Sequence, residues 1–348
     1  MSDVVVEIRD QSLALVRRQL ADGVDRPMLA GQYFLRCYLP EGQVLTRGLR
    51  IEANQSIIVE LPRELAEGDE RFTASWAHRR PGRRLNVSAD RDVRFYAFTS
   101  LDRVEPVQGP QVAVEDTRSE LLTLVVSLPD DWTDRVVFAR ITPRGEVPVH
   151  VALPCGRGFP TCRLTLSGTV RGVSARASLA DPRAELALRY LRHGLVREAA
   201  MVSERVAGVV DPVAAAAIEL VHLRTREARP DGGGLADLLP QLGWLPDVAV
   251  LLAELDSHNE QYAVALLEAL RLLGLPVLTG WLSAALHRLA ELSVSPSTAV
   301  AERAESLYRS LLRWALFQEP DASTVSITCA DLNDPAGSQV VPGWAQVR

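Results

Sequence analysis

The segment LPCGRGFPTC, residues 153–162, contains two of the chain's four cysteines, Cys155 and Cys162. A cysteine thiolate that is activated by a histidine is the nucleophile of one class of hydrolases. His193, in the sequence RHG, is the histidine that such a site could use. The alternative is a glycine-rich hairpin loop in which the two thiols are close enough to oxidise.

Cys155, followed by glycine and arginine, loosely resembles the nucleophile segment of caspase-like proteases, and His193–Gly194 resembles their His-Gly pair. In that family the histidine precedes the cysteine, and both lie at the ends of parallel strands. Here Cys155 comes first, in a region whose pattern predicts antiparallel strands, and His193 lies at an expected helix break. The sequence therefore favours the hairpin loop, and no residue is assigned a catalytic role. An enzyme with a divergent site that includes Cys155, His150 or acidic residues stays as an alternative.

Other common catalytic signatures are absent from the sequence. The 38 basic residues are all arginine, so the chain cannot supply a phosphate-loop lysine or a Schiff base. It contains neither a G-x-S-x-G nucleophile elbow nor an H-E-x-x-H metal helix. The histidines lie too far apart along the chain to suggest a metal site, at positions His78, His150, His193, His222, His258 and His287. We therefore expect no metal and no cofactor.

Large aromatic residues in the second half of the chain are the candidates for binding a protein partner. They are Trp244, Tyr262, Trp281 and Trp314. Aromatic residues are the usual anchors of protein interfaces. The same tryptophans could instead pack inside the fold, which is the alternative prediction for all three of them.

The charge composition of the chain limits the classes of molecule that it is expected to bind. The chain of 348 residues has a formal net charge of -6 and a pI near 5.6, which is too mild to indicate an electrostatic hold on nucleic acid. The first residues contain no basic region followed by an apolar segment, so we expect a cytoplasmic protein with free thiols.

Residues 3 to about 178 have a hydrophobic period of two, in short runs separated by Pro, Gly, Asp and Asn. This pattern predicts antiparallel β-sandwich modules. In the run QYFLRCYL, alternation places Tyr33, Leu35, Cys37 and Leu39 on one face of a strand. Further runs predict a meander that continues to about residue 61.

The period changes at Asp181–Pro182, a signal for the start of a helix, and helices are predicted to about Phe317. A shift of 64 positions aligns Leu188 with Leu252 and Pro212 with Pro276 without a gap. Such a repeat predicts helical hairpins that stack as a short solenoid. Charged residues interrupt every apolar run here, which excludes a membrane span.

These patterns predict an α+β multidomain protein, with one or two N-terminal antiparallel β-sandwich modules and a C-terminal tetratricopeptide-like solenoid. The predicted divisions are a small sandwich at 1–66, a junction at 67–92, a second sandwich at 93–180, a helical repeat domain at 181–317 and a tail at 318–348 that is disordered or adds a strand.

The motifs DPVAAA, WLPD and GLPV, within residues 181–292, resemble a helical module of multidomain bacterial proteins. Such proteins accompany caspase-like or subtilisin-like proteases in conflict and programmed-death systems. The resemblance implies a non-enzymatic adaptor or regulator that binds a protein, with such a protease as a possible partner and no membrane insertion. A glycan- or peptide-binding β-sandwich is a further alternative.

Overall fold

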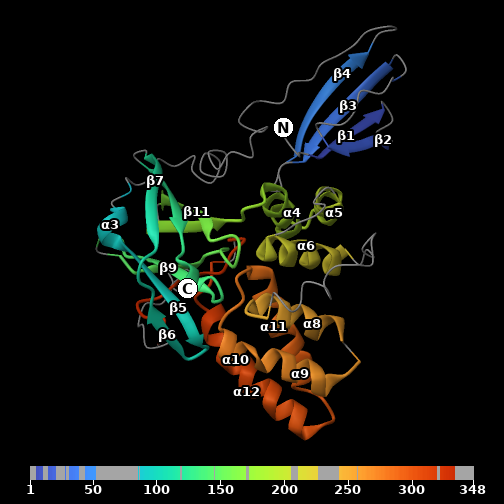
Figure 1. Cartoon of the computed structure of the whole chain (residues 1–348). Coiled ribbons are helices and arrows are strands. Elements are labelled where there is room, and N and C mark those ends of the chain that lie inside the picture. Colours follow the sequence, from blue (N-terminus) through green and yellow to red (C-terminus); the bar gives the residue numbers. More distant parts are fainter. Residues whose placement is uncertain are drawn as a thin grey trace, which may run out of the picture. The chain divides into compact units, whose positions relative to one another are not determined.

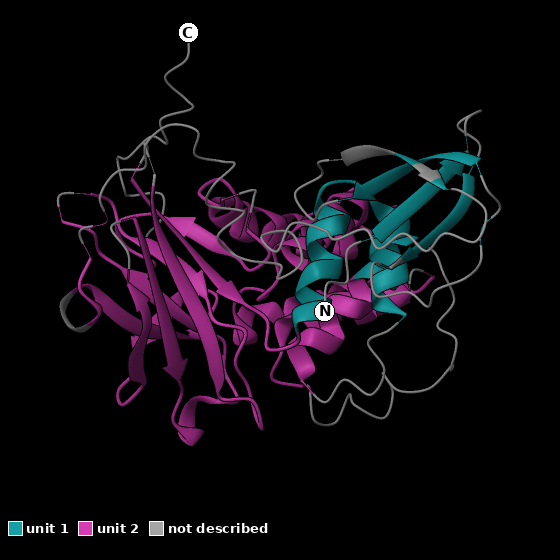
Figure 2. Ribbon diagram, turned by 90° about the horizontal axis from the view of Figure 1, so that it is seen from above, with its two compact units in different colours: residues 1–81, 182–208, 221–227 teal, residues 82–181, 209–220, 228–348 magenta. Residues whose placement is uncertain are grey.

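The computed structural model describes residues 5–10, 15–20, 28, 31–38, 44–51, 85, 87–117, 120–144, 146–169, 172–204, 211–225, 243–256, 258–319 and 322–333. Antiparallel sheets form the N-terminal part and helices the C-terminal part, which confirms the α+β class (Figure 1). The chain divides into two compact units, residues 1–81, 182–208 and 221–227, and residues 82–181, 209–220 and 228–348 (Figure 2). Each unit thus combines strands with helices from later in the chain.

The first unit contains a four-stranded antiparallel sheet in the order β2-β1-β3-β4. Its strands are β1 (Val5–Asp10), β2 (Leu15–Leu20), β3 (Gly31–Tyr38) and β4 (Val44–Ile51). Tyr33, Leu35 and Cys37 are buried on one face of β3, as the alternation predicts. Leu39, the third strand of the meander and most of the predicted junction lie outside the described residues.

A buried carboxylate joins this sheet to the helices of the same unit. Glu7 on β1 is fully buried and accepts hydrogen bonds from Arg18 Nε at 2.9 Å and from the Tyr38 hydroxyl at 2.8 Å. Burial opposes its ionisation, but these hydrogen bonds outweigh burial and lower the pKa of Glu7. Arg18 also reaches Glu198 of α5 (Val196–Ser203) at 3.7 Å. The acid therefore stabilises the unit as an ion, because its charge is matched.

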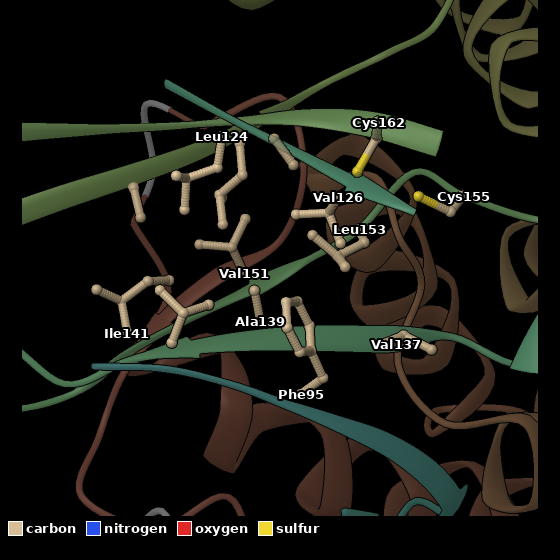
Figure 3. Close-up of a cluster of buried hydrophobic side chains, with 14 of the residues drawn as sticks. Phe95, Leu124, Val126, Val137, Ala139, Ile141, Val151, Leu153, Cys155 and Cys162 are labelled. Atoms are coloured by element: carbon tan, nitrogen blue, oxygen red, sulfur yellow. The ribbon is translucent and has the colours of Figure 1, made fainter. Parts of the chain in front are cut away.

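The second unit contains two antiparallel sheets that share one hydrophobic core (Figure 3). One sheet has the order β13-β10-β9-β5-β6 and the other β12-β11-β8-β7. Their strands are β5 (Val93–Ser100), β6 (Arg103–Pro106), β7 (Gln111–Thr117), β8 (Leu121–Ser127), β9 (Val137–Ile141), β10 (Val149–Ala152), β11 (Thr161–Thr169), β12 (Gly172–Ser178) and β13 (Ser326–Thr328). Short helical turns are α3 (Ala89–Asp92) and a 3-10 turn at Asp130–Trp132. A β-sandwich in this part of the chain is what the period of two predicts.

The sheet that contains β5 is buried on both faces. Val93 and Phe95 of β5 enter the sandwich core, whereas Phe98 contacts Trp314 of α12 (Thr298–Ala315) with ring centroids 5.5 Å apart. Gly274 has φ +90°, and a Cβ there would lie 2.5 Å from Cβ of Phe98. Glycine therefore lets the helical chain approach the strand closely. Burial on both faces explains why all four residues of β10 are buried.

The helical part repeats its elements at the predicted spacing. α4 and α8 begin at Pro182 and Pro246, and α5 and α9 begin at Val196 and Glu260, in both cases 64 positions apart. The third helix of the second copy begins at Thr279, three residues later than Pro212 predicts. The helices are α4 (Pro182–Arg192), α6 (Pro212–Thr225), α8 (Pro246–Leu255), α9 (Glu260–Glu268), α10 (Leu270–Leu273), α11 (Thr279–Leu292) and α12 (Thr298–Ala315). A tetratricopeptide-like solenoid stays a prediction.

The predicted tail supplies a strand. β13 pairs antiparallel with β10 at the edge of the sandwich sheet, and Ile327 and Cys329 are fully buried. Val325 donates its N–H to the Val277 carbonyl, and its own carbonyl accepts from the Ala152 N–H, both at 2.8 Å. Residues 322–333 therefore belong to the folded second unit. Residues 334–348 lie outside the described part of the chain.

The boundaries predicted at residues 66, 92, 180 and 317 stay predictions. The compact units do not follow them, because helices α4 and α5 belong with the first sheet. Of the helices that the structure describes, none combines the length and the apolar character needed to cross a membrane.

Candidate interaction surface

The four aromatic residues proposed as partner contacts differ in exposure. Trp281 and Trp314 are fully buried, Trp244 is partly buried, and Tyr262 is 48% exposed. Trp281 donates its indole N–H to the Ala216 carbonyl at 3.0 Å. The burial of Trp281 and Trp314 agrees with the packing alternative, so in this conformation only Tyr262 presents a large aromatic surface to a partner.

Trp244 covers the hairpin at Cys155–Cys162. A Cβ on Gly156 would lie only 2.4 Å from Cζ2 of its indole ring, so this contact requires glycine at the hairpin. Trp244 lies two residues before Pro246, the first residue of α8. Its contacts therefore attach the second helical copy to the sandwich of the same unit.

Tyr262 belongs to an exposed apolar row on α9 and α10. Asn259 caps α9, since its Oδ1 accepts from the Tyr262 N–H at 3.1 Å. The opposite face of the helix is buried, at Ala263, Val264 and Leu267. Ala269, with right-handed helical φ and ψ, joins α9 to α10. Apolar residues at Tyr262, Ala265, Ala269 and Leu272 therefore follow one another, with Ala269 half-buried and the other three exposed, and we call this row the α9–α10 stripe.

The spacing of this stripe is three, four and three residues. That is the spacing of the apolar seam of a coiled coil, in which two helices pack side by side. Leu272 is 75% exposed. Single apolar residues with such exposure are common on protein surfaces, but a row of apolar residues at helical spacing is uncommon. The stripe can therefore accept a second helix that carries apolar residues at the same spacing.

An ion pair and a hydrogen bond to α12 border the stripe. Glu268 accepts a hydrogen bond from Arg303 Nε at 3.1 Å, and this contact lowers the pKa of Glu268. Arg271 donates to the Ser306 hydroxyl at 3.0 Å. These contacts hold α9 and α10 against α12, so the stripe stands on a supported helix with a polar margin.

The groups of the enzymatic alternative are buried. Cys155 is 1% exposed, and a hydrogen bond to Cys162, together with burial, raises its pKa well above the ordinary value. A reactive thiol needs the opposite shift and access to solvent. His150 is equally buried, and burial lowers its pKa to about 4, while its Nε2 lies 3.0 Å from the Cys329 carbonyl. Neither group has the environment of a nucleophile or a general base.

A groove of about 450 Å³ lies where the chain crosses from one sheet of the sandwich to the other. This volume is within the range of small-ligand sites. The strands beside the groove, β6 and β7, are edge strands of their sheets within the described residues. Its lining includes the apolar Phe95, Val107 and Val112 and the polar Arg94, Tyr96 and Gln108.

The sequence pattern did not identify two buried carboxylates, Asp211 and Asp247. Asp247 is fully buried, and its two oxygens accept from the N–H groups of Val277 at 2.7 Å and Leu278 at 2.9 Å. Asp211 accepts from the Val213 N–H at 3.0 Å at the start of α6. Asp211 immediately precedes α6, whereas Asp247 lies in the first turn of α8 and binds the backbone just before α11. Burial raises the pKa of both to about 6.

Within the described residues, no group of three His, Cys, Asp or Glu side chains could hold a metal ion.

A family model described as the Y4kD C-terminal domain matches residues 186–336, less than half of the chain. The matched residues include the second helical copy and β13. No curated protein and no solved structure matches the chain.

Proposed function

We propose that this protein is a non-enzymatic interaction module that binds an amphipathic helix of a partner protein on the α9–α10 stripe. The observation that carries the proposal is the row of exposed apolar residues at coiled-coil spacing. A partner helix would place its own apolar residues between Tyr262 and Leu272. Helix recognition of this kind depends on anchors at such intervals.

The two large residues of the stripe would contribute most of the affinity. Complete burial of a leucine contributes about 1.5–3 kcal/mol, and Leu272 has three quarters of its surface available. Tyrosine is enriched among the residues that dominate interfaces. Small residues at Ala265 and Ala269 leave space between these two anchors for the partner's side chains.

The finer proposal concerns the partner itself. The resemblance of DPVAAA, WLPD and GLPV to modules of bacterial conflict systems supports a regulator or adaptor of a caspase-like or subtilisin-like protease. The protein would then act in the cytoplasm, where such an effector works. Nothing in this proposal requires a catalytic residue on the present chain.

A binding experiment tests the stripe. Proteins captured from the native host by the full chain are identified and purified, and their affinity is measured by titration calorimetry. Leu272→Asp and Tyr262→Asp should each weaken binding by about 2 kcal/mol, roughly 30-fold, because they place a carboxylate at a desolvated contact.

Val114→Asp is the matched control, because Val114 is an exposed apolar residue on β7, with 56% of its surface accessible. It should leave the affinity unchanged, and thermal unfolding should confirm that all three variants are folded. A partner that binds both stripe variants with wild-type affinity would show that the stripe is not its docking site.

A second candidate function is recognition of a short extended peptide by the sandwich, which the groove at β5, β6 and β7 favours. Edge strands accept peptides through backbone hydrogen bonds, and neighbouring pockets select the side chains. We expect Tyr96→Ala or Gln108→Ala to reduce the affinity for a peptide selected from a display library about tenfold, which is about 1.4 kcal/mol. Tyr308→Ala on α12 serves as control. If a selected peptide binds both groove variants normally, its site lies elsewhere.

A further inference from the structure

Cys155 and Cys162 flank a tight hairpin in the second unit. Gly156 and Phe159 exchange two backbone hydrogen bonds, of 3.0 and 2.9 Å, across the hairpin. Cys162 is the second residue of β11 and pairs with Val126 of β8 in the core of the sandwich. The two cysteines therefore belong to one local structure, and their backbone positions are determined by the sheet and by the turn.

The two thiols also belong to the same hydrophobic cluster and form a hydrogen bond with each other. Figure 3 shows the two side chains as neighbours at one end of the cluster. The other two cysteines differ. Cys37 lies in the core of the first unit, and the thiol of Cys329 contacts the Asp331 carbonyl oxygen. Among the described residues, Cys155 and Cys162 are therefore the two cysteines that interact within one cluster.

We propose that Cys155 and Cys162 are a redox-sensitive pair that forms an intramolecular disulfide when the protein meets hydrogen peroxide. One thiolate attacks the peroxide, its sulfur is oxidised to a sulfenic acid, and hydroxide leaves to become water. The second thiol then attacks this sulfur, the S–S bond forms and a second water leaves. Two thiols and one peroxide thus give one disulfide and two waters.

The position of the pair explains how the oxidant gains access and what the bond would change. Arg157 and Gly158 form the exposed tip of the hairpin. The proposed reaction requires this tip to open, because the thiols are buried in the closed state. At rest, the interaction with Cys162, burial and the nearby Asp211 raise the pKa of Cys155 and disfavour its thiolate, so the reaction is slow in the closed state. Once formed, the disulfide closes the loop beneath Trp244 and fixes the support of the second helical copy.

Arg157 lies between the two cysteines, which provides a specific assay. The folded wild-type chain is treated with hydrogen peroxide, excess oxidant is removed, and free thiols are alkylated under denaturing conditions before digestion with trypsin. The expected product is residues 145–157 linked to residues 158–163, two hydrogens lighter than the sum of the separate peptides. Alkylated cysteines should fall from four to two per chain, and a reducing agent should restore all four.

Cysteine variants distinguish a disulfide between Cys155 and Cys162 from oxidation of other cysteines. A Cys37→Ser, Cys329→Ser double variant keeps the pair and should give the same linked peptides. Cys155→Ser should give none. Four alkylatable cysteines after treatment, oxidation of Cys162 beyond the sulfenic acid without a linked peptide, or a disulfide between two chains would each overturn the proposal. None of these results depends on whether the α9–α10 stripe binds a partner.

Discussion

Asp247→Ala should destabilise the protein by about 3–4 kcal/mol at pH 5, because it leaves two buried N–H groups without acceptors, at about 1–3 kcal/mol each. Those groups belong to Val277 and Leu278, immediately before α11, and no solvent reaches the carboxylate that binds them. Denaturation by urea, followed by circular dichroism, measures the loss. The acidic pH matters because the carboxyl group is then mostly protonated, and the cost of burying its charge is small.

Two further variants make this test specific. Asp247→Asn keeps the shape and one acceptor oxygen, so its loss should be about half as large. Asp134→Ala removes an exposed ion pair with Arg157 and should cost less than about 1 kcal/mol. An Asp247→Ala protein as stable as the wild type at pH 5 would mean that the cap contributes nothing to the fold.

Stability should also depend on pH through Asp211 and Asp247 together. Both have a folded-state pKa of about 6, raised from an ordinary value of 3.8 by burial, and Asp181 adds to the shift at Asp211. A raised carboxyl pKa means that the folded state holds the proton more tightly than the unfolded state. The contribution of each protonated carboxyl group to the free energy of unfolding is therefore complete below about pH 4. It is lost as the pH rises through 6.

The expected loss between pH 4 and pH 7 is about 2–3 kcal/mol for each residue. Asp211→Asn and Asp247→Asn should each remove one such contribution from the pH dependence of the unfolding free energy. The unfolding free energies of variant and wild type are compared at the same pH. The comparison at equal pH is needed because His150, whose pKa is lowered, has the opposite sign and loses its contribution as the pH falls. Identical slopes for wild type and both Asn variants would show that these carboxyl groups titrate normally.

Local signals in the sequence predicted the elements well. Pro182 starts α4 as the change of period predicts, and the shift of 64 positions recurs at Pro246 and Glu260. Alternation along β3 gave the buried face of that strand. These successes share one cause, which is that each depends on residues close together in the chain.

Contacts between distant residues were not predictable in the same way. The motifs WLPD and GLPV were noticed only as a resemblance, whereas the structure shows that Asp247 of the first binds the backbone of the second. A single aspartate in a helical run gives no signal for a partner 30 residues away. The pairing of the β10 edge depended equally on a tail strand nearly 180 residues later.

The candidate interaction surface was predicted only in part, because one sequence cannot separate a buried aromatic residue from an exposed one. Trp281 and Tyr262 lie in neighbouring helices of similar composition, yet one hydrogen-bonds inside the core and the other faces solvent. Their difference comes from the direction in which each helix packs. The exposed row was recognisable only when burial of Ala263 and Leu267 defined the opposite face.

The pairing of β13 with β10 has a consequence for synthesis on the ribosome. β13 covers the edge of β10 in the folded protein. During synthesis this edge stays unpaired until residues 326–328 have been made, long after the other sandwich strands have left the ribosome. Domains usually fold from the N-terminus during translation, and an open edge invites pairing with another chain. Nascent chains should therefore be prone to edge-to-edge association, and a stop codon before residue 326 should convert a folded protein into an aggregating one.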